Sequence, residues 1–148
     1  MGVIGAGKMG LLHSGIFNSL DESKLTAISD KDGFVVNALN TYLPGVHVYQ
    51  NYRDMLDRED LDIVVIATPI FLHNEMIQDS MAHALAIFVE KPLALDGQEC
   101  RSILNKNYKN VTLVGYCRRF METYSLAKKI IDNEHLGNVN FFTTQTGF

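Results

Sequence analysis

Three glycines, Gly5, Gly7 and Gly10, stand near the start of the chain, between an apolar pair and a segment of helical period. The pair Val3-Ile4 indicates the end of a strand, and the apolar spacing that follows predicts a helix over residues 9–20. In G-x-G-x-x-G the first glycine permits a tight turn, the second lets a pyrophosphate approach the backbone, and the third lets helix and strand pack closely. The opening therefore predicts a strand–loop–helix unit whose helix N-terminus faces an anion.

Short apolar runs alternate with longer segments of helical period as far as about residue 116. The run at 63–67 is continuous and mostly β-branched, which indicates a central parallel strand covered on both faces. Asp96 is predicted to cap a helix, with Glu99 completing a capping box. The alternation predicts an α/β fold with a doubly wound parallel sheet. The predicted strands lie at 3–4, 25–30, 46–48, 63–67, 86–89 and 111–116, and the predicted helices at 9–20, 34–43, 52–57, 72–83, 97–107 and 121–133.

Asp30 ends the second predicted strand, about 20 residues after the last glycine, which is the expected distance to the carboxylate that binds the adenosine ribose. A carboxylate there repels a 2′-phosphate, so we expect NAD in preference to NADP. The neighbouring Lys31 could soften that repulsion, and NADP stays open. The alternative is a glycine-rich turn without a ligand, with Asp30 only capping the strand end or the next helix.

Two further strands end in proline at the edge where ligands of such sheets bind. The fourth ends in Ala67-Thr68-Pro69 and the fifth in Glu90-Lys91-Pro92. Proline stops each strand and sets its last side chains at the crevice. Lys91 is thus a candidate for contact with a substrate oxygen or the nicotinamide ribose, although an exposed, solvated lysine is equally compatible with its position.

Composition excludes several classes of protein. The formal net charge of −4 offers no basic surface for nucleic acid or anionic lipid. No apolar run approaches the length of a membrane span, and no signal peptide is recognisable, so a cytoplasmic location is expected. Cys100 and Cys117 stand alone, and we expect two reduced, buried thiols with no disulfide and no metal site.

An ordered set of motifs resembles one family. The glycine loop, Asp30, "DIVVIATPIFLH" at 62–73, "VEKPLAL" at 89–95 and "GYCRRF" at 115–120 are similar to the N-terminal domain of the glucose–fructose oxidoreductase, inositol dehydrogenase and MocA family. The resemblance implies a Rossmann domain over 1–120. It also implies that 121–148 is the connecting helix and first strand, at 139–146, of a second α/β domain that is otherwise absent.

The resemblance also implies roles for single residues. Lys91 would lie near the nicotinamide and the reacting oxygen, and Glu90 would bind cofactor ribose or fix Lys91. His73 would stand close by, although a packing role for it stays open, and at least one of Arg118 and Arg119 is expected to be surface charge only. Lys91 is predicted to be catalytic, and the predicted cofactor-binding residues are Gly5, Ala6, Gly7, Lys8, Met9, Gly10, Asp30, Lys31, Ala67, Thr68, Pro69, His73, Glu90, Lys91 and Arg119.

The complete protein is expected to move hydride between nicotinamide and a CH–OH centre of a sugar, polyol or related carbonyl compound. The chain alone is expected to be inactive or weak, because the resemblance assigns the other catalytic groups and a homo-oligomer interface to the second domain. The main alternative is a stand-alone NAD(P)-binding sensor. The Glu90-Lys91-Pro92 motif argues against it, because a sensor does not need a lysine at the hydride-transfer edge. A methyltransferase-like domain fits the glycine spacing and Asp30 less well.

Overall fold

A computed structural model describes the whole chain except residues 107, 134–136, 142 and 144–148. The chain divides into two compact units, Met1–Gly115 and Tyr116–Phe148. The sequence places a boundary at residue 120, and the contacts place it five residues earlier, where the last strand of the sheet has just ended. The assignment of residues 121–148 to a second domain stays a prediction.

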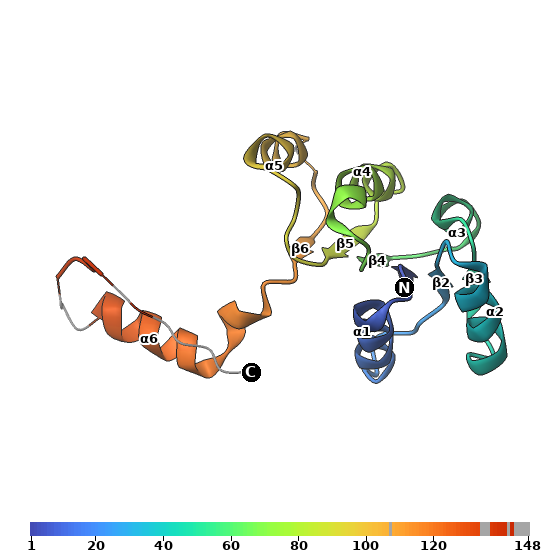
Figure 1. Cartoon of the computed structure of the whole chain (residues 1–148), viewed down its shortest axis with the longest axis horizontal. Coiled ribbons are helices and arrows are strands. Elements are labelled where there is room, and N and C mark those ends of the chain that lie inside the picture. The colour runs from blue at the N-terminus through green and yellow to red at the C-terminus, as the bar shows by residue number, and fades with distance from the viewer. Residues whose placement is uncertain (107, 134–136, 142, 144–148) are drawn as a thin grey trace. The chain divides into compact units, whose positions relative to one another are not determined.

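The first unit is built on a six-stranded sheet, whose strands lie side by side in Figure 1. All the paired strands run parallel. The strand order is β3-β2-β1-β4-β5-β6. The chain first adds strands on one side of β1 and then, from β4 on, adds them on the other side, as in a doubly wound Rossmann fold. The fold class predicted from the sequence is therefore confirmed. The strands are β1 (Gly2–Ile4), β2 (Ala27–Ser29), β3 (His47–Tyr49), β4 (Ile63–Ile66), β5 (Ala86–Val89) and β6 (Thr112–Val114).

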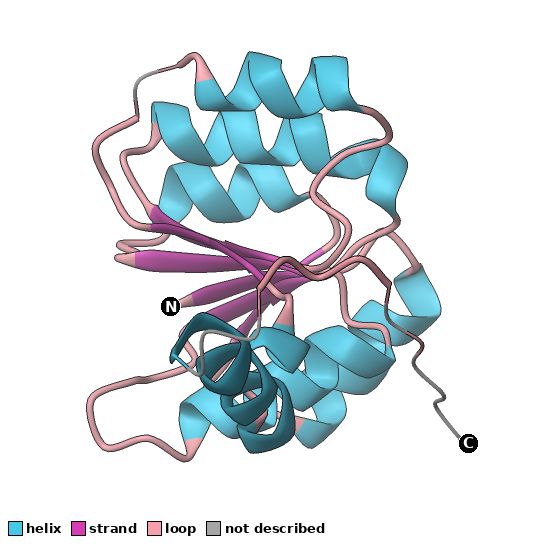
Figure 2. Cartoon of the chain, turned by 90° about the vertical axis from the view of Figure 1, so that its left-hand side faces the viewer, coloured by secondary structure: helices cyan, strands magenta, loops and turns pink. Residues whose placement is uncertain are grey.

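Helices cover both faces of this sheet (Figure 2). On β4, Val64 and Ile66 join the cluster packed by α3, α4 and α5, whereas Val65 joins the cluster packed by α1 and α2. All three side chains are fully buried, which confirms the prediction of a strand covered on both sides. The helices are α1 (Lys8–Asn18), α2 (Gly33–Tyr42), α3 (Tyr52–Arg58), α4 (His73–Ala82) and α5 (Gly97–Leu104), with a short 3-10 turn η1 (Ile70–Leu72) before α4.

Helix N-termini follow the predicted capping chemistry with one correction. Asp96 caps α5 by accepting hydrogen bonds from the N–H groups of Gln98 and Glu99. The expected reciprocal bond of the capping box is not made, because the Glu99 carboxylate accepts from the N–H of Leu95 at 2.9 Å rather than from Asp96. Glu99 thus still bonds back to the backbone before the helix, at Leu95 instead of Asp96.

The second unit contains the turn η2 (Cys117–Phe120) and the helix α6 (Glu122–Asn133), so the helix predicted at 121–133 is confirmed. The strand predicted at 139–146 is not found at 139–141 or 143, and its other residues lie outside the described part of the chain. Cys117 is exposed and Cys100 half-buried, so the expectation of two buried thiols is wrong, and both cysteines are free. Among the described residues, no helix is both long and apolar enough to cross a membrane.

Candidate cofactor site

Two of the three glycines are required by close approach of the backbone. Gly5 has φ +93°, and a Cβ placed there would lie 2.7 Å from the carbonyl oxygen of Ala67. A Cβ on Gly10 would lie 1.8 Å from the carbonyl oxygen of Gly5. These contacts give the turn and the close helix–strand packing that the spacing predicts.

Gly7 differs from its neighbours, because a Cβ there would meet nothing within 4 Å. It is the N-cap of α1, and no side chain caps this helix end. By contrast Asp32, Asn51 and Asp96 cap α2, α3 and α5 with their own oxygens. The N-terminus of α1 therefore keeps free N–H groups beside open space, which is the arrangement that binds a phosphate.

Asp30 fixes the glycine loop as well as facing the site. Its Oδ2 accepts a hydrogen bond from the N–H of Ala6 at 2.8 Å, and its Oδ1 accepts one from the N–H of Asp32 at 2.9 Å. Each carboxylate oxygen can accept a second bond, so the side chain still has acceptors for ribose hydroxyls. Asp30 is therefore in direct contact with the glycine loop, although it lies 24 residues from Ala6 in the sequence.

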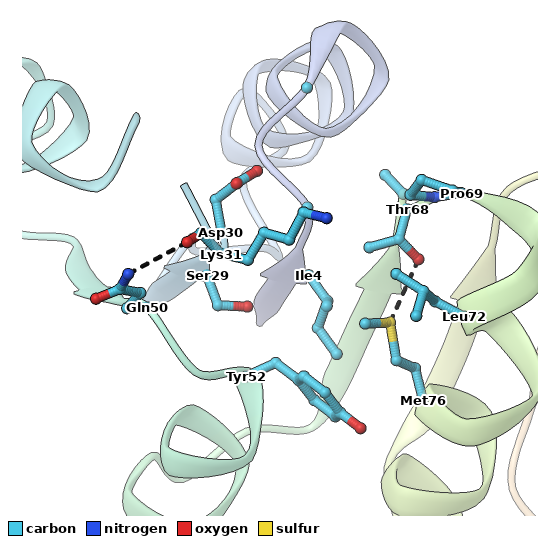
Figure 3. A pocket seen from close by; sticks show the side chains of 13 residues that line it. Ile4, Ser29, Asp30, Lys31, Gln50, Tyr52, Thr68, Pro69, Leu72 and Met76 are labelled. Atoms are coloured by element: carbon cyan, nitrogen blue, oxygen red, sulfur yellow. Dashed lines mark hydrogen bonds between the residues drawn. The ribbon is translucent and has the colours of Figure 1, made fainter. Parts of the chain in front are cut away.

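A pocket of about 220 Å³ opens at the carboxyl ends of β1, β2, β3 and β4, where the strand order reverses (Figure 3). Among the predicted site residues, Gly5, Gly7, Asp30, Lys31 and the end of β4 line it, whereas Ala6 and Gly10 do not. Gln50 also lies there, with its Nε2 donating to the carbonyl oxygen of Lys31 at 3.2 Å. The pocket is lined by Ile4, Gly5, Gly7, Ser29, Asp30, Lys31, Gln50, Tyr52, Ala67, Thr68, Pro69, Leu72 and Met76.

The wall formed by Tyr52 is held by a charged network between α3 and α4. The Tyr52 hydroxyl donates to Asp79 at 2.6 Å, and the Arg53 Nε–H donates to the same oxygen at 2.8 Å. Burial, and then the hydrogen bond to Asp79, raises the pKa of Tyr52 well above its usual range. The hydroxyl therefore stays protonated and keeps the ring against the pocket.

Glu90 and Lys91 do not line this pocket, but they are tied to the helix that begins at the glycine loop. His13 of α1 contacts Glu90, with 2.7 Å between Nε2 and Oε1. The other oxygen of Glu90 accepts from the N–H of Lys91 at 3.1 Å. Lys91 is exposed, and the Lys91–Pro92 peptide bond is cis.

His73 lies at the start of α4 and is 1% exposed. Its Nε2 lies 2.9 Å from the carbonyl oxygen of Thr68, and its Nδ1 lies 3.0 Å from that of Pro92. The ring thus contacts the main chain just after both proline-terminated strands, β4 and β5. Of the two roles that the sequence left open, the structure supports the packing role, and direct contact with a cofactor stays a prediction.

The remaining predicted residues lie elsewhere. Lys8 and Met9 are exposed on the first turn of α1. Arg118 and Arg119 belong to the second unit, where they line a cleft with Tyr124, Ser125 and Lys128. The part of Arg119 in cofactor binding stays a prediction. Within the described residues, no group of three or more His, Cys, Asp or Glu is placed to hold a metal ion.

Sequence reasoning missed several residues of this region. His13 follows Gly10 by three positions and so shares its helix face, which was a usable signal. The other missed residues come from separate elements that only the sheet order brings together. They are Ile4, Ser29, Gln50, Tyr52, Leu72 and Met76.

Comparison with known proteins identifies the family. Residues 1–116 match the family described as "Oxidoreductase family, NAD-binding Rossmann fold". The matched range includes the glycine loop, the pocket and Lys91. The chain belongs to this family. The resemblance to the glucose–fructose oxidoreductase, inositol dehydrogenase and MocA proteins is therefore confirmed.

Individual relatives are inositol dehydrogenases. The chain is 29% identical over 142 residues to an inositol 2-dehydrogenase from Burkholderia multivorans, covering 93% of this chain and 42% of that protein. It superimposes on myo-inositol 2-dehydrogenase from Lactobacillus plantarum with TM-score 0.81 and 32% identity, covering 93% of this chain and 42% of the other. For myo-inositol dehydrogenase from Lactobacillus casei, in complex with NAD(H) and myo-inositol, the TM-score is 0.82, the identity 26% and the coverage 92% and 42%. The chain thus spans about two fifths of the length of these relatives.

Proposed function

We propose that this chain is the NAD-binding part of a dehydrogenase that acts on a CH–OH group of a polyol, sugar or related compound. The observation that carries the proposal is the uncapped N-terminus of α1 at Gly7, which opens beside a pocket that holds the Asp30 carboxylate. A dinucleotide needs both an anion site and a ribose acceptor at this separation along the chain. The family match and the inositol dehydrogenases among the relatives support the reaction class.

The residues present fit such a cofactor, because the space that a Cβ on Gly7 would fill lies open at the pocket. The N–H groups of the first turn of α1 would hold the pyrophosphate, and Asp30 would accept hydrogen bonds from the adenosine ribose. When bound, nicotinamide supplies the hydride chemistry. The ammonium of Lys91 can then donate to the reacting oxygen and take part in proton transfer at its Nζ.

NAD rather than NADP is the preferred cofactor in this proposal. Asp30 lines the pocket with a negative charge that repels a 2′-phosphate, and Lys31 lines it as well. A homo-oligomer in the complete protein and a cytoplasmic location remain predictions from the sequence.

Calorimetric titration of the chain with NAD and with NADP tests the proposal. Gly7→Val should abolish NAD binding, because its side chain enters the space for the pyrophosphate while meeting no protein atom within 4 Å at its Cβ. Asp30→Asn should narrow the preference for NAD, because it removes the charge and keeps an oxygen for the N–H of Ala6. A folded chain that binds neither nucleotide, or a Gly7→Val variant that binds as well as the parent, would contradict the proposal.

A further inference from the structure

We infer that His13 and His73 are positioning residues that hold the segment Glu90-Lys91-Pro92 from two sides and so fix where Lys91 presents its side chain. The inference rests on the role proposed above for Lys91. It assigns functions to one histidine that the sequence did not single out and to another whose role was open. Both histidines come from helices, and each contacts a residue directly beside Lys91.

The first contact comes from α1. A carboxylate can only accept hydrogen bonds, so the Nε2–H of His13 donates to Glu90 across the 2.7 Å contact. The two side chains are 13% and 12% exposed, which shields the pair from solvent. The imidazole ring also packs edge-on against Phe88 of β5, with 4.8 Å between ring centroids. Ring packing and hydrogen bond together leave the Glu90 side chain little freedom.

Glu90 passes this restraint on to Lys91. While its Oε1 is held by His13, its Oε2 accepts from the backbone N–H of Lys91 at 3.1 Å. The carboxylate thus bridges an imidazole and the main chain of the proposed catalytic residue. Freeing the carboxylate from His13 would weaken the bridge, since an untethered glutamate samples other rotamers and competes for water.

The second contact comes from α4. His73 lies between the carbonyl oxygens of Thr68 and Pro92, at 2.9 and 3.0 Å from its two ring nitrogens. A ring protonated on both nitrogens donates to both oxygens, whereas a neutral ring donates to one. Pro92 follows Lys91 directly, and Thr68 lines the pocket, so this ring ties the Lys91 segment to the pocket wall.

The His13 contact also connects the Lys91 segment with the proposed pyrophosphate site. His13 lies on the same helix as the uncapped N-terminus at Gly7. A ligand that orders the first turn of α1 therefore acts on a helix that is bonded to Glu90. Helix α1 therefore takes part both in cofactor binding, through its N-terminus, and in the placement of Lys91, through His13.

Solvent-exchange NMR on the ¹⁵N-labelled chain tests the first contact. His13→Ala should raise the exchange rate of the Lys91 amide about fivefold to tenfold, which corresponds to the loss of one hydrogen bond. His13→Gln should restore part of the protection, because an amide N–H can still donate to Glu90. The matched control is His83→Ala, which breaks a ring–carboxylate contact of 3.0 Å to Asp57 and should leave Lys91 unchanged.

The second contact is tested in the parent chain, so that misfolding of a variant cannot obscure the result. A His73 Nδ1–H that donates to the carbonyl oxygen of Pro92 should give a resolved, slowly exchanging proton signal in the ¹⁵N spectrum. A His73 Nδ1–H that is absent or exchanges as fast as that of a free imidazole would overturn this contact, and an unchanged Lys91 amide in His13→Ala would overturn the first.

NADH titrated into the same samples separates this inference from the proposed function. A parent chain that does not bind NADH would remove the proposed function, while the two exchange measurements would still report whether the segment is held. Conversely, tight NADH binding together with an unprotected Lys91 amide would remove the positioning role and leave the cofactor site intact.

Discussion

At the scale of single residues, two glycines of the loop have different roles, Gly10 in folding and Gly7 in binding. Gly10→Ala should destabilise the chain strongly, because the new Cβ would lie 1.8 Å from the carbonyl oxygen of Gly5. Gly7→Ala should change the free energy of unfolding by about 1 kcal/mol or less, since only an N-cap preference is lost, but should weaken NAD binding. Thermal unfolding and an NAD titration of both variants check this pair. A Gly10→Ala variant as stable as Gly7→Ala would contradict the packing argument.

His83 should make stability depend on pH. Its ring donates to the backbone oxygen of Asp79 and to the carboxylate of Asp57, and these bonds raise the pKa of His83 above its ordinary value of 6.5. The protonated ring is favoured in the folded state, so its stabilisation is present at low pH and is lost as the pH rises through the raised pKa. His83→Gln should therefore lower the melting temperature more at about pH 5.5 than at about pH 8.5. An equal loss at both pH values would argue against this origin.

At the scale of secondary-structure elements, side chains cap α2, α3 and α5, whereas neither α1 nor α4 has a side-chain cap. Asp96 holds the N-terminus of α5 through two backbone N–H groups. Asp96→Ala should lower the free energy of unfolding by about 1 kcal/mol. Asp96→Ser should retain most of the stabilisation that the cap gives, because a serine hydroxyl can also cap the helix. Urea denaturation followed by circular dichroism measures both, and NAD affinity should be the same in all three proteins. Equal losses in the two variants would show that the cap contributes through charge alone.

At the scale of the whole molecule, every strand of the sheet and every residue lining the cofactor pocket lies in the unit Met1–Gly115. A chain ending at Gly115 should therefore unfold cooperatively with a melting temperature within a few degrees of the parent. The comparison also tests Arg119. If Arg119 binds cofactor, both the shortened chain and Arg119→Ala should bind NAD more weakly than the parent, whereas unchanged affinity in both would remove Arg119 from the site.

Local chemistry in the sequence determined much of this protein. The glycine spacing, the β-branched run at 63–67 and the cap at Asp96 can each be interpreted from a few neighbouring residues. Such features depend on backbone conformation and burial pattern, which short stretches of sequence specify. The alternation of strands and helices then leads to a parallel sheet, and the sheet to a ligand edge.

Only the tertiary structure decided which distant side chains meet at that edge. His13 and Glu90 are 77 residues apart, and Tyr52 and Asp79 are 27 apart. These pairs depend on the order of strands in the sheet and on which helix covers which face, and no local pattern encodes either choice. His73 shows the same limit: its place in the sequence allowed a cofactor contact or a packing role, and only burial between two carbonyl oxygens gave it a position. The residues that hold the Lys91 segment in place were therefore settled by long-range packing.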